Sequence, residues 1–99
     1  MTETDLVKDI VEALEVRFTP SVWIKIHGHQ FQAAGIPDLV GCCIGRFIGI
    51  EVKLPGKESE FTKLQQYWVK LINKCGGHAT MVTTVDQAVS FVARALKKG

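Results

Sequence analysis

Three ionisable residues in the middle of the chain have types and spacing suited to metal-assisted hydrolysis. Asp38 opens one apolar run, and Glu51 and Lys53 close the next, with Gly45-Arg46 between the two runs. Apolar, partly β-branched runs on either side of a short turn are typical of a β-hairpin. A turn centred on Ile44-Gly45 places Asp38 opposite Glu51 on one face of the sheet. Because side chains alternate along a strand, Lys53 shares the face of Glu51.

Two opposed carboxylates repel each other, and apolar surroundings make each buried charge costly. A shared proton would relieve this, and so would a divalent cation of the magnesium type, which prefers carboxylate oxygens and keeps bound water. Lys53 then lies where it can activate a water or stabilise charge on a phosphate. The group suits metal-assisted phosphodiester hydrolysis. From spacing alone, an ordinary hairpin with a surface Asp, Glu and Lys is the alternative.

The wider motif resembles a known nuclease family. Pro37-Asp38, then twelve residues, then Glu51-Val52-Lys53 matches the PD-(D/E)XK nuclease signature. The longer strings resemble its VRR-NUC branch, in the stand-alone form typical of phages. These strings are Gly35-Ile36-Pro37-Asp38-Leu39, Phe47-Ile48-Gly49-Ile50-Glu51-Val52-Lys53 and Leu64-Gln65. The resemblance extends over nearly the whole chain.

The resemblance implies an Mg²⁺- or Mn²⁺-dependent endonuclease that acts on DNA. Asp38 and Glu51 are expected to bind the metal together with Glu3 and the backbone carbonyl of Val52. Lys53 is expected to activate water or to stabilise the transition state. Stand-alone VRR-NUC proteins look like dimeric junction resolvases, so the resemblance also favours a dimer that cuts branched DNA.

A first helix is expected from about Thr2 to Phe18, because apolar residues recur there at three- and four-residue steps. At about 100° per residue, Glu3 falls inside the apolar stripe and Glu12 falls toward solvent. In the resembling family a Glu of the first helix contributes to the metal site, and Glu3 fits that position, with Glu12 as the second choice. The alternative is an exposed Glu in the first turn, favoured there by the helix dipole.

A second helix is expected from an N-cap at Ser59 to about Cys75. Gln65 falls beside the apolar stripe of this helix, whereas Gln66 falls toward solvent. A Gln within an apolar stripe needs polar partners. In the resembling family a Gln here points into the active site, and Gln65 is therefore predicted to orient Lys53 or water. Satisfaction by nearby backbone is the alternative.

The remaining segments complete an α/β fold. Val22 to His27 and His78 to Thr84 are expected to be strands, and Thr84 opens a last helix with a capping-box pattern. His29, Gln30 and Gln32 occupy a polar loop that could meet substrate. The order is α-β-β-β-α-β-α, with a helix between the third and fourth strands that implies a parallel crossover. The prediction is a four-stranded mixed sheet flanked by helices, a restriction-endonuclease-like core.

Length and composition fit one globular domain spanning residues 1–99, with 46% hydrophobic and 22% charged residues. No apolar run is long enough for a transmembrane helix, and the acidic N-terminus lacks a signal core, so we expect a cytoplasmic protein without membrane partners. A net charge of +2 is too small to indicate nucleic-acid binding by itself. Lysines near the expected site supply local charge: Lys53, Lys57, Lys63 and Lys70.

The cysteines and histidines do not form a zinc-binding pattern. Cys42, Cys43 and Cys75 lack a CxxC spacing and are expected to be buried free thiols. His27 and His29 can share one strand face, but no further ligand is apparent.

The assembly expected from the sequence is a symmetric homodimer that cuts four-way DNA junctions. A small subunit has one active site, whereas resolving a junction takes two cuts, which a two-fold dimer supplies. Some apolar residues must be exposed on so small a monomer and suggest an interface. They are Val7 and Val11, at the edge of the first helix stripe, and Trp23, Tyr67 and Phe91, off the stripes of their elements. The alternatives are a monomer with scattered surface aromatics, a non-catalytic nucleic-acid-binding or assembly module, and a nuclease for linear duplex DNA or RNA.

Overall fold

The computed structural model describes residues 1–27 and 34–98. The elements are α1 (Glu3–Arg17), β1 (Ser21–Lys25), β2 (Leu39–Cys43), β3 (Arg46–Val52), the short 3-10 helix η1 (Glu58–Glu60), α2 (Lys63–Lys74), β4 (His78–Val82) and α3 (Val85–Lys97). The predicted order of helices and strands is confirmed. The loop residues His29, Gln30 and Gln32 lie outside the described residues.

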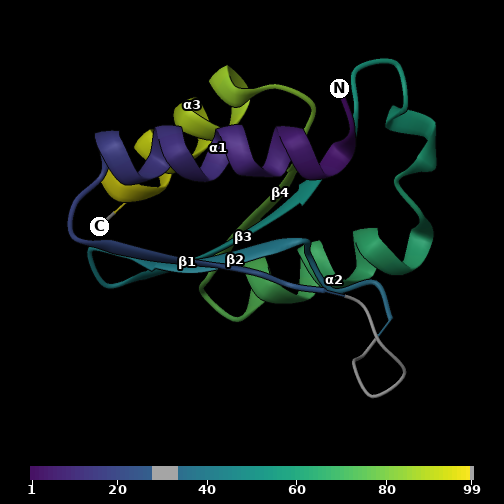
Figure 1. Ribbon diagram of the computed structural model, residues 1–99. Coiled ribbons are helices and arrows are strands. Elements are labelled where there is room, and N and C mark those ends of the chain that lie inside the picture. The colour runs from purple at the N-terminus through teal and green to yellow at the C-terminus, as the bar shows by residue number, and fades with distance from the viewer. Residues whose placement is uncertain (28–33, 99) are drawn as a thin grey trace.

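The four strands form one mixed sheet in the order β1-β2-β3-β4. The first three strands are antiparallel, and β4 runs parallel to β3 with α2 as the crossover. Helices α1 and α3 lie side by side on one face of the sheet, and α2 lies on the other face against β3 and β4 (Figure 1). The predicted mixed sheet flanked by helices is therefore confirmed.

The β2–β3 hairpin has the predicted register. Its turn residues Ile44 and Gly45 both have positive φ, 48° and 80°. Two such residues form the turn whose twist matches that of antiparallel strands. Leu39 consequently pairs with Ile50, and the next step of the ladder places Asp38 across from Glu51.

The main core lies between the sheet and the layer formed by α1 and α3. Leu6, Ile10 and Leu14 are buried along the predicted stripe of α1. They meet buried residues of the sheet and of α3, namely Leu39, Cys43, Ile48, Ile50, Val52, Val82, Ala88, Val92 and Ala95. None of the described helices is long and apolar enough to cross a membrane.

Helix α2 begins later than the sequence suggested. Thr62, rather than Ser59, is its N-cap. The Thr62 hydroxyl accepts a hydrogen bond from the backbone N–H of Gln65, and the Gln65 side chain accepts one from the backbone N–H of Thr62. This reciprocal pair satisfies two free donors at once, which explains why the helix begins after Thr62. Ser59 lies in η1.

Most of the apolar residues expected to form an interface are not at the surface. Val7 is buried, and Val11, Trp23 and Phe91 pack against the core, so of the five proposed interface residues only Tyr67 is exposed. Val7, Val11 and Phe91 face inward because α1 and α3 lie together over the sheet, which widens the buried side of both helices. Trp23 packs against the same core from β1. Large apolar side chains are exposed elsewhere: Met1, Val16, Val22, Ile24, Ile44, Phe47 and Leu64.

The cysteines are also only partly as expected. All three are free thiols, but only Cys43 is buried. Cys42 alternates with it onto the opposite face of β2, and Cys75 lies at the C-cap of α2.

Candidate active site

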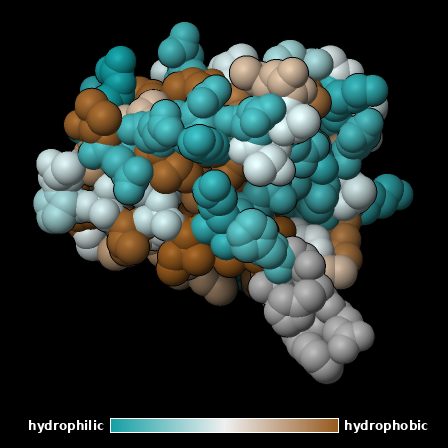
Figure 2. Space-filling view, viewed as in Figure 1, coloured by the Kyte–Doolittle hydropathy of each residue, from teal (hydrophilic) through white to brown (hydrophobic). Residues whose placement is uncertain are grey.

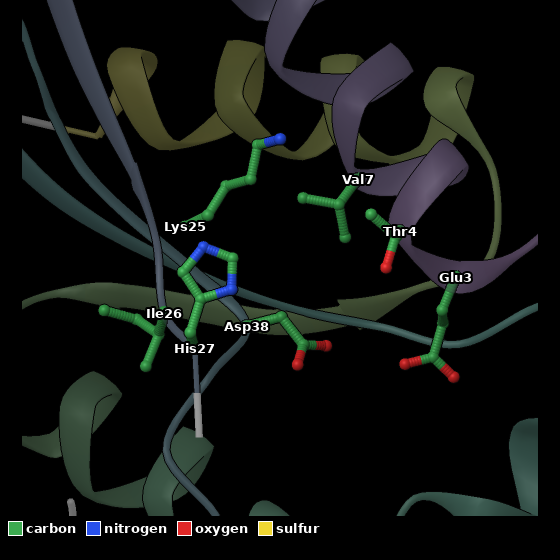
Figure 3. A pocket seen from close by; sticks show the side chains of 7 residues that line it. All are labelled: Glu3, Thr4, Val7, Lys25, Ile26, His27 and Asp38. Carbon is green, nitrogen blue, oxygen red and sulfur yellow. The ribbon is translucent and has the colours of Figure 1, made fainter. Parts of the chain in front are cut away.

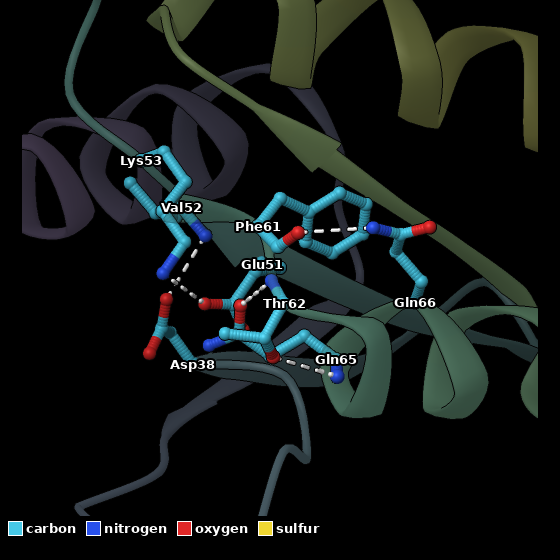
Figure 4. A network of polar contacts seen from close by, with 8 residues as sticks. All are labelled: Asp38, Glu51, Val52, Lys53, Phe61, Thr62, Gln65 and Gln66. Carbon is cyan, nitrogen blue, oxygen red and sulfur yellow. Dashed lines mark hydrogen bonds and ion pairs between the residues drawn. The ribbon is translucent and has the colours of Figure 1, made fainter. Parts of the chain in front are cut away.

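Asp38, Glu51 and Lys53 come together at one end of the β2–β3 hairpin, as predicted (Figure 4). Lys53 Nζ lies 3.3 Å from Glu51 Oε2. The backbone N–H of Val52 donates a 2.9 Å hydrogen bond to Asp38 Oδ2. Glu51 and Lys53 are only 2% and 7% exposed. The hairpin thus buries an acid and a base next to each other, with a second acid at the rim.

The electrostatics of this group favour a proton or a cation on Glu51. Burial raises the pKa of Glu51 to about 8, the negative charge of Asp38 adds to the rise, and Lys53 opposes it. Within the described residues, Glu51 Oε1 is fully buried and has no hydrogen-bond partner. A buried polar atom without a partner is costly. An unpaired carboxylate oxygen beside a second carboxylate is therefore a suitable ligand for a cation.

The donor set fits magnesium or manganese better than a metal that needs a full protein cage. Magnesium commonly takes one or two carboxylates and keeps several waters. Asp38 and Glu51 supply the carboxylates. The backbone carbonyl oxygen of Val52 is the further metal ligand that the motif predicts. Within residues 1–27 and 34–98, no three His, Cys, Asp or Glu side chains gather closely enough to hold an ion. Glu3 accordingly stands apart from the Asp38–Glu51 pair.

Glu3 shares a pocket with Asp38 instead. This pocket has a volume of about 100 Å³ and is lined by Glu3, Thr4, Val7, Lys25, Ile26, His27 and Asp38. The carboxylates of Glu3 and Asp38 point into it from opposite sides (Figure 3). Thr2 caps α1 directly before Glu3, so the helix reaches far enough back for the predicted placement of Glu3. Glu12 is exposed and does not line the pocket.

The segment that carries Asp38 is held by α2 and β1. The indole N–H of Trp68 donates a 3.0 Å hydrogen bond to the carbonyl of Ala34. Gly35 has φ of +87°, and a Cβ there would lie 2.6 Å from Leu64 Cγ. The carbonyl of Asp38 accepts a 2.7 Å hydrogen bond from the N–H of Ile26. A glycine is thus required at position 35 because the backbone there lies close to Leu64 of α2. This explains the Gly that precedes Ile36-Pro37-Asp38 in the motif.

Gln65 lies on the first turn of α2, and Figure 4 draws it with the site residues. Its side-chain oxygen accepts the N–H of Thr62 at 2.9 Å. Among the described residues no hydrogen bond from its side-chain nitrogen is present, so this nitrogen remains able to donate. Gln66, expected at the surface, is half-buried and donates to the carbonyl of Phe61. The later helix start explains this difference.

Two pocket residues were not selected from the sequence. Lys25 and His27 line the same pocket as Glu3 and Asp38. The sequence pattern predicts that Lys25 and His27 lie on the same face of a strand. It does not predict that α1 packs over β1, which is what brings them close to Glu3.

Comparison with models of known protein families and with curated proteins found no match for this chain. Membership of the VRR-NUC family therefore remains a prediction from the motif.

Proposed function

We propose that this protein is a metal-dependent endonuclease of the PD-(D/E)XK type that hydrolyses phosphodiester bonds in DNA. The observation that carries the proposal is the buried carboxylate of Glu51, whose Oε1 is unpaired among the described residues, beside Asp38 and Lys53. Folding alone gives no reason to bury Glu51 and Lys53 beside a second acid, Asp38. The VRR-NUC-like motif around these residues supports the same conclusion.

Each residue has a distinct role in this proposal. Asp38 and Glu51 would hold Mg²⁺ or Mn²⁺, with the Val52 carbonyl as a further ligand. The ion, when bound, would supply Lewis acidity and an activated water. Lys53 is held by Glu51 at 3.3 Å, where its positive charge can stabilise the negative charge that develops on the phosphate. Gln65, from α2, and Glu3, from α1, would be positioning residues for water at this site.

Cleavage assays test this mechanism directly. Labelled linear and branched DNA is incubated with the protein in Mg²⁺, Mn²⁺ or EDTA. We expect metal-dependent cleavage, a loss of at least 100-fold in Asp38→Asn and Lys53→Met, and wild-type activity in the exposed control Glu12→Gln. Cleavage in EDTA, or full activity in the first two variants, would overturn the mechanism. Salt-dependent DNA binding without metal binding or cleavage would instead indicate a non-catalytic nucleic-acid-binding module.

We further propose that the protein acts as a symmetric homodimer on branched DNA such as four-way junctions, inside the cytoplasm. Two opposite cuts require two sites, and a two-fold dimer matches the symmetry of a junction. The outer face of the β1–β2–β3 sheet offers a surface for a second copy. The register aligns Val22, Cys42 and Phe47 in one row across it. All three are exposed and uncharged, so two copies can meet there without opposing like charges.

Paired incisions test the substrate part of the proposal. A synthetic four-way junction labelled on each strand should be cut at symmetric positions, with little cutting of a linear duplex of the same sequence. Preferential cutting of the linear duplex would restrict the proposal to a general DNA endonuclease.

A further inference from the structure

Lys25 and His27 form one wall of the pocket that contains Glu3 and Asp38. Lys25 is the last residue of β1, and His27 follows two residues later, beyond the end of the strand; both line the pocket. Figure 3 shows the imidazole of His27 between Lys25 and Asp38, and Glu3 across the pocket. The pocket thus has a nitrogen-bearing wall and a carboxylate-bearing wall.

The lysine of this wall is not used by the fold. Across the described residues the two ion pairs are Lys53–Glu51 and Lys57–Glu60, and neither involves Lys25. Lys25 is also exposed. Lys25 lines a pocket with two carboxylates and makes an ion pair with neither within the described residues, so its ammonium can bind another anion. The two acids alone would repel such an anion, so the nitrogen-bearing wall is the side that can attract it.

The pocket opens to solvent and has a volume of about 100 Å³. This leaves room for a compact group such as a phosphate at its wall. Lysine offers a positive charge with three donors, and histidine offers an N–H donor in both protonation states. These are suitable donors for the oxygens of a phosphodiester.

We propose that Lys25 and His27 bind the DNA backbone phosphate next to the scissile one, and so position the strand across Asp38. This inference rests on the proposed nuclease function. Lys53 is buried with Glu51 and serves the reacting phosphate, whereas Lys25 is exposed at the pocket wall and serves its neighbour. Both Lys25 and His27 are positioning residues: they hold the substrate and take no part in bond cleavage.

Binding measured without cleavage tests the subsite. Fluorescence anisotropy with a labelled DNA duplex in EDTA compares wild type with Lys25→Met, which keeps the apolar length of the side chain. The matched control is Lys8→Met, an exposed lysine of α1 that does not line the pocket. We expect Lys25→Met to weaken binding about tenfold and to reduce the slope of log Kd against log salt by about one. Lys25→Arg and Lys8→Met should bind like wild type, and His27→Ala should weaken binding less than Lys25→Met.

Kinetics in Mg²⁺ give a second readout. Because a contact with a flanking phosphate is the same in the ground and transition states, Lys25→Met should raise KM and leave kcat nearly unchanged. Equal affinity and equal salt slope for Lys25→Met and Lys8→Met would overturn the subsite, as would a wild-type protein that does not bind DNA in EDTA. If wild type binds through Lys25 but does not cleave, the nuclease proposal fails while the phosphate subsite stands.

Discussion

Glu51 is a buried acid whose burial destabilises its charged form. Its side chain is 2% exposed, one of its oxygens has no partner among the described residues, and its nearest neighbours are an acid and a lysine. Burial raises the pKa of Glu51 from its usual 4.5 to about 8. The folded protein therefore prefers the protonated acid at neutral pH. A metal ion would replace that proton and recover the cost of ionising Glu51.

The pH dependence of stability follows from this shift. Between pH 4.5 and about 8 the unfolded chain has lost the Glu51 proton while the folded chain retains it. The free energy of unfolding should therefore fall as pH rises through this interval, by up to about 5 kcal/mol from this group alone. Glu51→Gln keeps the size of the neutral acid and does not titrate. It should match wild type near pH 5 and exceed it in stability at pH 8.5, while losing cleavage.

Urea unfolding of metal-free protein from pH 5 to 9 measures this difference. The exposed variant Glu12→Gln serves as control and should run parallel to wild type. If Glu51→Gln shows the same pH dependence as wild type, the titration does not belong to Glu51.

At the scale of elements, local patterns predicted the active-site hairpin well. Two apolar runs and a turn at Ile44-Gly45 were enough to place Asp38 across from Glu51, because a two-residue turn fixes the register. The predicted N-cap of α2, Ser59, was wrong, because the helix is capped by Thr62. Ser59 and Thr62 are both good N-cap residues, and the reciprocal bond with Gln65 decides between them. Apolar periodicity does not distinguish between these two N-cap residues.

The pocket was only half predicted, for a related reason. Glu3 followed from the apolar stripe of α1, since a helix face can be calculated from one segment. Lys25 and His27 become part of the site only through the packing of α1 over β1. Trp68 likewise donates a hydrogen bond to the carbonyl of Ala34, which lies 34 residues earlier in the chain. Periodicity within one helix or strand does not predict which distant segments pack together.

The approach of α2 to the Asp38 segment predicts a specific effect at Gly35. Gly35→Ala places a Cβ 2.6 Å from Leu64 Cγ, at φ of +87°. Gly56→Ala is a matched control, because Gly56 has φ of +86° and open space around it. We expect Gly56→Ala to cost about 1 kcal/mol from backbone strain alone. Gly35→Ala should cost a further 1–3 kcal/mol, and it should lower cleavage by displacing Asp38.

A double variant separates the clash from the strain. Leu64→Ala in the Gly35→Ala background removes the Cγ atom and should restore part of the lost stability, so the two changes should be non-additive. Chemical denaturation of the four proteins gives the coupling energy. Additive losses would mean that Leu64 does not hold the Asp38 segment.

For the whole molecule, the informative feature is the distribution of apolar surface. Helices α1 and α3 cover one face of the sheet, and α2 packs on the other face against β4 and β3. On the outer face of β1, Val22 and Ile24 are 56% and 54% exposed. In Figure 2 hydrophobic surface gathers along the lower side of the molecule, beneath the strands, and hydrophilic residues cover much of the upper side. A surface of this kind on a small domain favours association.

The dimer prediction can be tested at this surface with two matched charges. Ile24→Glu places an acid on the outer face of β1, and Val16→Glu places one on α1, where Val16 is 84% exposed. An unpaired charge in an interface is costly, so Ile24→Glu should dissociate the dimer and Val16→Glu should not. Light scattering at micromolar concentration should give about twice the 10.9 kDa subunit mass for wild type and Val16→Glu, and 10.9 kDa for Ile24→Glu. Circular dichroism should be the same for all three, and paired incision of a junction should be lost with the dimer. A wild-type mass of 10.9 kDa would contradict the predicted dimer. If the Ile24→Glu variant is still a dimer, the interface lies on another face.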